Sequence, residues 1–233
     1  MLNGIDTNTI NPATDEAIYK KYDYSTIRFK SFNKNALQKE MGLTETNDVP
    51  VIGMVTRLTS QKGIDLLCEV MNEISDLPIQ LNALGTGDNH FESFFYSWEQ
   101  SRHDKIRGYI GFSAQMAQKI YAGADLFLMP SKTEPCGLSQ LIAMRYGTIP
   151  IVHSVGGLHD TVEAYNPETK TGTGITFQSY NAYDMLDAIR RAVDLFHNKP
   201  HWRTIRKNAM NGDYSWEKPA KEYIEIYKEI ISK

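Results

Sequence analysis

Short apolar runs rich in β-branched residues alternate with amphipathic segments from about residue 50 onward. The five strand-like runs lie at residues 51–55, 79–84, 106–110, 126–129 and 148–152. Between them, apolar side chains recur at three- and four-residue spacing, as at Ile64, Leu67, Cys68 and Met71, which predicts amphipathic helices. This alternation is typical of right-handed βαβ units, so we expect an α/β protein with a Rossmann-like doubly wound parallel sheet.

The two ends of the chain have different patterns. Apolar stripes at helical spacing run through residues 185–196 and 223–230, and Pro200 ends the first of these helical segments. Residues 1–45 are rich in Asn and Lys and show little periodicity, so we interpret them as loop plus a short helix. The pattern divides the chain into a lead-in segment (1–45), one α/β domain (46–212) and a C-terminal helical segment (213–233).

Composition and charge narrow the class of function. Of the 233 residues, 41% are hydrophobic and 23% are charged, as in ordinary globular proteins. With a formal net charge of −3 there is no basic stripe to follow phosphates, so we expect no nucleic-acid partner. Neither a signal peptide nor a membrane-length apolar run is found, and two cysteines make no disulfide framework, so we expect a cytoplasmic protein without a membrane partner. Cys68, on the apolar side of its helix, is expected in the core.

A doubly wound sheet binds ligands beyond the carboxyl ends of its strands, so the loops after the strands are where chemistry is expected. The loop after residues 51–55 holds Arg57 and Lys62, five residues apart and just before a helix. The N–H groups at a helix N-terminus favour an anion, Arg57 offers a two-pronged donor and Lys62 a point charge. A diphosphate is the guest that this pattern predicts, although the same charges would also suit a solvated loop.

The loop after residues 126–129 enters another helix through Glu134-Pro135-Cys136-Gly137-Leu138-Ser139. The N–H groups of Gly137, Leu138 and Ser139 are expected to point at a ligand. Glu134 is placed to accept hydrogen bonds from sugar hydroxyls, or alternatively to cap the helix. Cys136 has no histidine near it in sequence, so we do not interpret it as a nucleophile.

A third turn contains Gly156-Gly157, which lets a backbone approach a phosphate or a sugar closely or simply makes the turn. Phe112 ends a strand at the ligand edge and is a candidate to stack on a base. The chain has no Asp-x-Asp motif, and Pro200 separates His197 from His201, so we expect neither a metal ion nor another cofactor. The glycine patterns of dinucleotide-binding and P-loop proteins are absent as well.

Taken together and in order, these loops resemble the bacterial and plant glycogen (starch) synthase family. The resemblance rests on Arg57–Gly63, Pro130–Gln140, Arg145–Pro150, Gly156–Leu158 and Tyr214–Trp216, and the opening Asn3–Asp6 resembles that family's interdomain region. It implies a GT-B architecture of two Rossmann-like domains, of which this chain is the C-terminal, donor-binding one. The helix at 213–233 is then expected to pack back toward the interdomain region.

The resemblance also implies roles for individual residues. Arg57 and Lys62 match residues that neutralise the diphosphate of ADP-glucose, and Glu134 matches one that contacts the glucosyl hydroxyls. The backbone at Cys136–Gly137 is implied to orient the sugar, and Leu138–Ser139 to meet the ribose and phosphates. Glucose is transferred in that family with retained configuration to an α-1,4-glucan, with no metal and no established protein nucleophile.

Two further features bear on the resemblance. Phe112 stands where the family commonly has a tyrosine that stacks on adenine, and Ile142 stands where other GT-B enzymes carry a second glutamate eight residues after Glu134. The family's N-terminal half, with its Lys-x-Gly-Gly-Leu loop and much of the glucan site, is not in this chain, so we expect the chain alone to transfer little or no glucose. The alternatives are a GT-B transferase that uses a UDP- or GDP-sugar, a non-catalytic nucleotide- or glycan-binding module, and a structural Rossmann-like interaction protein.

Overall fold

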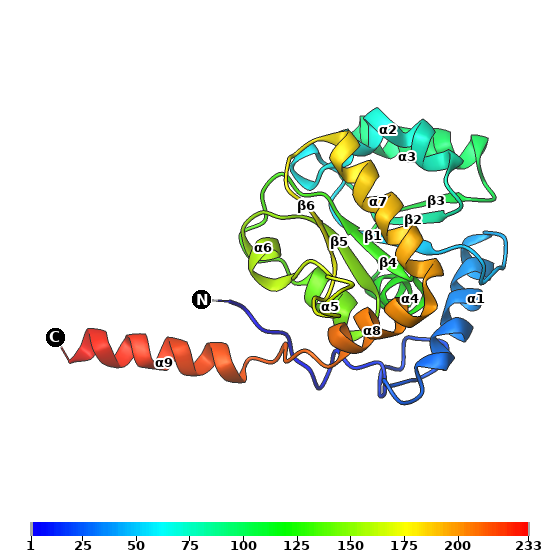
Figure 1. Ribbon diagram of the computed structural model, residues 1–233. Helices are drawn as coiled ribbons and strands as arrows, with labels where there is room; N and C mark the ends of the chain where they lie inside the picture. Colours follow the sequence, from blue (N-terminus) through cyan, green and yellow to red (C-terminus); the bar gives the residue numbers. More distant parts are fainter. Residues whose placement is uncertain (1, 233) are drawn as a thin grey trace.

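The computed structural model describes residues 2–232 and contains a six-stranded, wholly parallel sheet (Figure 1). The strands follow the order β3-β2-β1-β4-β5-β6. Their bounds are β1 Val51–Val55, β2 Gln80–Gly85, β3 Ile106–Ile110, β4 Leu126–Met129, β5 Ile149–His153 and β6 Ile175–Phe177. The predicted Rossmann-like doubly wound fold is confirmed, and the direction of strand addition reverses between β1 and β4, which makes their carboxyl ends the switch point of the sheet.

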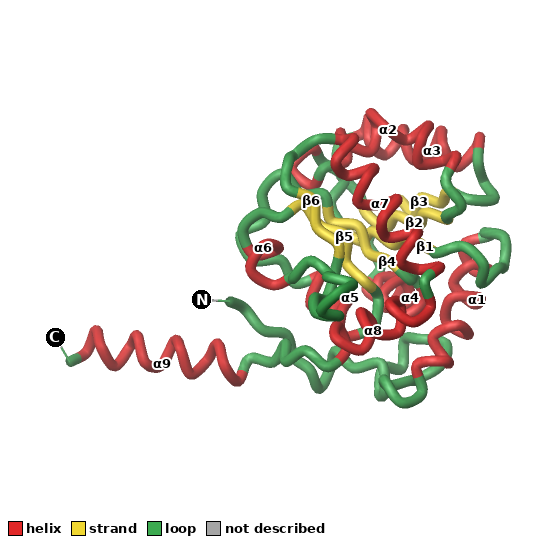
Figure 2. The backbone as a smooth tube through the Cα atoms, in the orientation of Figure 1, coloured by secondary structure: helices red, strands yellow, loops and turns green. Residues whose placement is uncertain are grey.

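Helices cover both faces of the sheet (Figure 2). The first half of the chain forms η1 Ile27–Phe29, α1 Lys30–Met41, η2 Ser60–Lys62, α2 Ile64–Asp76, α3 Asn89–Ser101 and α4 Ala114–Gly123. The second half forms α5 Ser139–Arg145, α6 Gly157–Thr161, α7 Ala182–His197, α8 Lys199–Met210 and α9 Glu217–Ile231.

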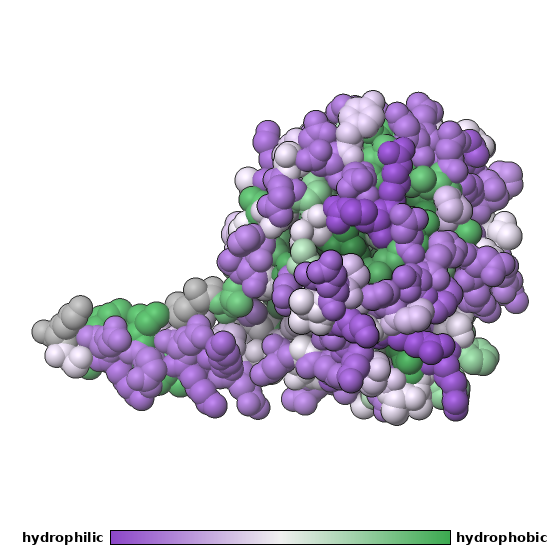
Figure 3. Space-filling view, in the orientation of Figure 1, coloured by the Kyte–Doolittle hydropathy of each residue, from purple (hydrophilic) through white to green (hydrophobic). Residues whose placement is uncertain are grey.

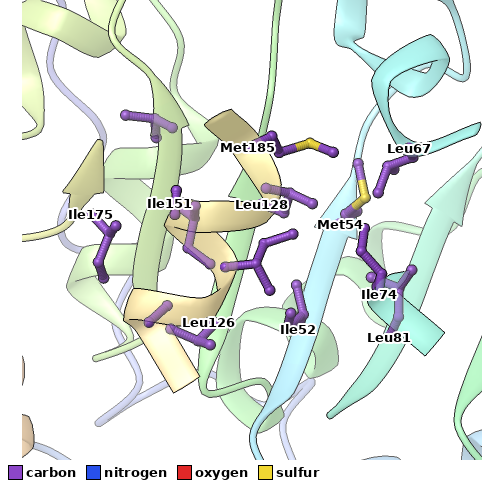
Figure 4. Close-up of a cluster of buried hydrophobic side chains, with 14 of the residues drawn as sticks. Ile52, Met54, Leu67, Ile74, Leu81, Leu126, Leu128, Ile151, Ile175 and Met185 are labelled. Carbon is purple, nitrogen blue, oxygen red and sulfur yellow. The ribbon is translucent and has the colours of Figure 1, made fainter. Parts of the chain in front are cut away.

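Two hydrophobic clusters, one on each face, hold these layers together. Ile52 and Met54 of β1 belong to the cluster beneath α2 and α7, whereas Val51 faces the cluster beneath α1 and α4. Figure 4 shows the first cluster, in which strand side chains meet Leu67 of α2 and Met185 of α7. Because successive residues of a strand point to opposite faces, a strand buried on both faces is mainly apolar, which explains the apolar runs of the sequence. The exceptions in β2 are Gln80 and Asn82, which are polar and buried.

The lead-in segment is more closely integrated with the sheet than its weak periodicity indicates. Leu37 of α1 is fully buried, and Tyr22 donates a hydrogen bond of 2.7 Å from its hydroxyl to the backbone carbonyl of Tyr146. The second face of the sheet is therefore completed by residues that precede the α/β alternation. Strand β6 was likewise missed in the sequence, because three residues are too few to show a period.

The expectation that Cys68 lies in the core is wrong: its side chain is exposed. The apolar side of α2 is formed by Leu67, Val70, Met71 and Ile74, and the backbone of Val70 departs from helical geometry. Leu67 therefore belongs to the buried side of α2 and its neighbour Cys68 does not, although Leu67 and Cys68 fit the same periodic pattern.

Helix α9 projects from the domain, and apolar residues gather along it (Figures 1 and 3). Ile224, Tyr227, Ile230 and Ile231 are exposed on this helix. The segment just before α9 contacts the start of the chain, where the N–H of Ile5 donates a 2.8 Å hydrogen bond to the backbone carbonyl of Tyr214. The packing of residues 213–233 toward an interdomain region stays a prediction. Within residues 2–232, no helix combines the length and the apolar character needed to cross a membrane.

Candidate functional site

The loops that leave β1 and β4 lie side by side at the switch point of the sheet. Both strands end in apolar residues, and polar residues come directly after them: Arg57 and Lys62 after β1, and Ser131 to Glu134 after β4. A backbone bond of 2.9 Å from the N–H of Lys132 to the carbonyl of Gln61 ties the two loops together.

Gly63 makes this close approach possible. Its φ of 79° lies in the left-handed region, and a Cβ there would stand 2.7 Å from the carbonyl carbon of Pro130 and closer still to its oxygen. A side chain at this position would therefore be strained by its backbone and would push the two loops apart. The glycine directly before α2 thus determines where Lys62 lies.

Lys62 and Glu134 form an ion pair across the two loops. The distance from Lys62 Nζ to Glu134 Oε2 is 2.6 Å, and the side chains are 18% and 11% exposed. The hydroxyl of Ser131 donates a 3.2 Å hydrogen bond to the same carboxylate oxygen. The pair is shielded from solvent but opens on a cavity, so a ligand that enters can compete for either partner.

Arg57 joins this cavity to a second one. Its Nη2 atom donates a 3.3 Å hydrogen bond to Gln61 Oε1, which holds the guanidinium over the loop. The first cavity has a volume of about 210 Å³ and is lined by polar residues that include Arg57, Lys62, Glu134 and Ser139. The second, about 230 Å³ and mainly apolar, is lined by Arg57 and by residues after β2 and β3.

Phe112 stands at the second cavity with its side chain 91% exposed. An aromatic face left open to water on the wall of an apolar cavity is suited to stack on a flat ring such as a nucleobase. The two cavities share Val55, Thr56 and Arg57, so a ligand with a flat ring at one end and phosphates at the other fits across them.

The N-terminus of α5 opens on the first cavity. Gly137, Leu138 and Ser139 all line it, and no side chain caps the helix. The first backbone hydrogen bond of the helix runs from the N–H of Ile142 to the carbonyl of Leu138. The N–H groups before Ile142 therefore take no part in the hydrogen bonds of the helix. Together with the two cations they supply donors for an anion.

Three predicted ligand contacts, Cys136, Gly156 and Gly157, are not among the residues that line the two cavities. They lie directly behind the Glu134 loop: the N–H of Gly157 donates a 2.9 Å bond to the carbonyl of Glu134. A Cβ on Gly157 would stand 2.5 Å from the carbonyl carbon of Cys136. In this structure the two glycines let the loop after β5 support the loop that carries Glu134, and their contact with a donor stays a prediction.

Sequence reasoning missed two residues that shape the site. Ser131 bonds to Glu134, and the buried His153 at the end of β5 places Nδ1 2.8 Å from the carbonyl oxygen of Ser131. Each lies at or just after the end of a strand, which is the available signal, but neither residue type indicates a supporting role. Across residues 2–232, His, Cys, Asp and Glu side chains do not gather in groups of three that could hold a metal ion.

Comparison with known proteins identifies the family of the chain. The family model for glycosyl transferases group 1 matches residues 38–211. A glycogen synthase of Anoxybacillus flavithermus is 52% identical over 232 residues, which cover 100% of this chain and 48% of that protein. A glycogen synthase of Bacillus subtilis is 51% identical over 231 residues, 99% of this chain and 48% of that protein. The chain thus spans about half the length of the curated relatives it matches.

A solved structure extends the likeness to three dimensions. The catalytic domain of starch synthase IV from Arabidopsis thaliana, determined with ADP and acarbose, superposes with a TM-score of 0.93 at 35% identity. The match covers 100% of this chain and 49% of that one. These comparisons confirm the family resemblance and the GT-B type of fold inferred from the motifs.

Proposed function

The chain belongs to the glycosyl transferases group 1 family, and from this premise we propose that it is the donor-binding half of a glycogen synthase. The enzyme would transfer glucose from ADP-glucose to the non-reducing end of an α-1,4-glucan, with retention of configuration. The observation that carries the proposal is the pairing of Lys62 with Glu134 in a polar cavity that continues, through Arg57, into the apolar cavity beside Phe112.

The two cavities match the parts of a nucleotide sugar. The base would stack on Phe112, and the diphosphate would meet Arg57, Lys62 and the first turn of α5. As the bond from the sugar to the diphosphate breaks, negative charge builds on the departing ADP. Cations and helix N–H groups already in place stabilise that charge without having to reorganise, which is the electrostatic form of catalysis.

Glu134 would accept hydrogen bonds from glucosyl hydroxyls while Lys62 holds its carboxylate. The ion pair serves both roles, because one cation orients the sugar-binding carboxylate and faces the diphosphate. We do not assign Glu134 as a nucleophile. The proposal includes a cytoplasmic location, supported by the free Cys68 and Cys136, and a reaction without metal or other cofactor.

Most of the acceptor site would lie in the half that this chain lacks, since the chain spans 48% of its glycogen synthase relatives. We therefore expect the isolated chain to bind ADP but to elongate α-1,4-glucan little or not at all. Incorporation of labelled glucose from ADP-glucose into glycogen measures this directly. Elongation at a rate typical of enzymes, with kcat of about 1 s⁻¹ or more, would contradict the assignment of the acceptor site to the missing half.

Nucleotide preference tests the donor. Calorimetric titration of the chain with ADP, UDP and GDP is expected to show the tightest binding for ADP. Tighter binding of UDP or GDP would instead favour a GT-B transferase with a different donor. If the chain binds none of the three nucleotides, a structural interaction module is the better interpretation.

Phe112 provides a graded test of base stacking. Phe112→Ala is expected to weaken ADP binding at least about 2- to 10-fold, because an aromatic contact contributes about 0.5–1.5 kcal/mol beyond the area it buries. Phe112→Tyr keeps the ring face and should bind ADP as the unchanged chain does. Tyr96→Ala removes another exposed aromatic ring from α3, outside both cavities, and is the matched control. If Phe112→Ala and Tyr96→Ala lose the same amount of ADP affinity, the base does not stack on Phe112 in this cavity.

A further inference from the structure

A cavity with strong positive charge lies at the opposite end of the sheet from the donor site. We propose that it binds a small phosphate monoester or free phosphate, between α1 and α8. Here this cavity is called the basic pocket; it has a volume of about 230 Å³ and is lined by residues that include Arg28, Lys30, Lys34, Lys199, Arg203 and Arg206.

The basic pocket and the donor site lie at opposite ends of the same two strands, β1 and β4. Asp125, which lines it, directly precedes β4, and its Oδ2 atom accepts a 3.0 Å hydrogen bond from the N–H of Val51, the first residue of β1. The pocket is therefore at the amino ends of the two strands whose carboxyl ends carry Arg57 and Glu134. A ligand bound here would not overlap a nucleotide at the donor site.

Positive charge in the basic pocket is poorly balanced. Two helices face each other with cations at helical spacing: Lys30 and Lys34 on α1, and Lys199, Arg203 and Arg206 on α8. Among the lining residues that the structure describes, Asp125 is the one carboxylate. Its Oδ2 atom already lies 2.8 Å from Lys34 Nζ.

Arg206 gives the independent sign that a ligand belongs here. Its Nε and Nη2 atoms are closed off from solvent and have no hydrogen-bond partner among the described residues, although the side chain lines the cavity. An ionised guanidinium with unmet N–H groups is costly to bury, and a turn of the side chain toward the cavity would let an acceptor with several oxygens relieve the cost. Burial lowers the pKa of Arg206, and the nearby Asp125 offsets only part of this effect.

The other residues of the basic pocket are also suited to a phosphoryl group. Lys30 Nζ is fixed by 2.8 Å and 2.7 Å hydrogen bonds to the carbonyl of Ala122 and the hydroxyl of Thr148, and burial lowers its pKa, so the cations available to a ligand are those of the other lining residues. Lys199 is exposed on α8; its Nζ atom lies 4.1 Å from the centroid of the Phe196 ring and donates a 3.1 Å hydrogen bond to the Phe196 carbonyl, a bond that it would exchange for one to a ligand. A phosphoryl group presents three acceptor oxygens, and the cavity is many times the space one water needs, so a small organic body can enter with it.

Titration calorimetry with inorganic phosphate and with glycerol 3-phosphate, at ionic strength held constant with chloride, tests the proposal. We expect saturable binding of both, tighter for the ester if the cavity also accommodates the organic part and equal if only the phosphoryl group is held. Arg206→Gln is expected to weaken binding about tenfold or more, as for loss of a charge-assisted contact, and the exposed Arg203→Gln about 3- to 10-fold.

Matched variants separate this site from its alternatives. Arg190→Gln removes an exposed cation of α7 outside both sites and should leave the affinity unchanged. Lys62→Gln should also leave it unchanged, because Lys62 belongs to the donor cavity. Circular dichroism checks that each variant is folded. If Arg206→Gln does not fold, Arg203→Gln still tests the proposal, because Arg203 is exposed and its replacement should not disturb the fold. The proposal is overturned if binding is not saturable, if Lys62→Gln abolishes it, or if Arg203→Gln and Arg206→Gln leave it intact. The ADP titrations test the donor site separately, so either proposal can fail while the other holds.

Discussion

Lys62→Gln is expected to weaken ADP binding about 10- to 100-fold, because a hydrogen bond to a charged group contributes about 1.5–3 kcal/mol. Lys62 Nζ lies 2.6 Å from the Glu134 carboxylate on the wall of the polar cavity. Removal of the cation takes one donor from the diphosphate and also leaves Glu134 unpaired beside it. Two negative groups would then share a cavity that excludes much of the solvent, so the loss exceeds that of a surface charge. Titration calorimetry with ADP measures the change.

Two further variants isolate the cause. Lys132→Gln removes a neighbouring exposed cation that does not line the cavity, and ADP affinity should stay within about twofold of the unchanged chain, as for a surface charge worth a few tenths of a kcal/mol. The double variant Lys62→Gln/Glu134→Gln should recover part of the lost affinity, since the unpaired carboxylate is gone. If Lys62→Gln binds ADP as tightly as Lys132→Gln, the polar cavity is not a diphosphate site.

Gly63→Ala is expected to lower the free energy of unfolding by about 3 kcal/mol, from a left-handed backbone that costs an L-residue about 1–2 kcal/mol and an overpacked contact that costs about 1–3 kcal/mol. The φ of Gly63 is 79°, and the added methyl would stand 2.7 Å from the carbonyl carbon of Pro130. Denaturation by urea, followed by circular dichroism, measures the change. ADP binding should fall as well, because the methyl separates the loop of Lys62 from that of Glu134.

Ser60→Ala is the control for Gly63→Ala. Ser60 is exposed in the same loop, and its backbone carbonyl, which accepts from Gly63, is retained in the variant. Its stability should stay within about 0.5 kcal/mol of the unchanged chain, as is usual for surface substitutions. Equal stability of the two variants would mean that the loops can part without cost, and that Gly63 does not set the position of Lys62.

Several elements were predictable because their signals are local. The runs at 51–55, 106–110 and 126–129 coincide with β1, β3 and β4, and those at 79–84 and 148–152 are displaced by one residue from β2 and β5. Strands buried on both faces are mainly apolar, so their runs stand out in the sequence of a parallel sheet. The polar residues after β1 and β4 were found by the same logic, since ligands bind beyond the carboxyl ends of such strands.

Other features escaped because several structures share one local pattern. Cys68 and Leu67 fit the same helical stripe, yet only Leu67 is buried, because the elements that pack against α2 decide which side of the helix is covered. The packing of Leu37 and Tyr22 was hidden by the polar composition of the lead-in segment. The backing role of Gly156 and Gly157 depends on a neighbouring loop that their own sequence does not reveal.

The sequence by itself determined the parallel sheet, the loops with chemistry and the family to which they belong, because hydrophobic period and strand-end residues are properties of short segments. Only the tertiary structure decided which of these residues meet. Lys62 and Glu134 are 72 positions apart, and α1 and α8 face each other from opposite ends of the chain. Contacts of this kind leave no period in the sequence, since they arise when distant segments bury their apolar faces on one sheet.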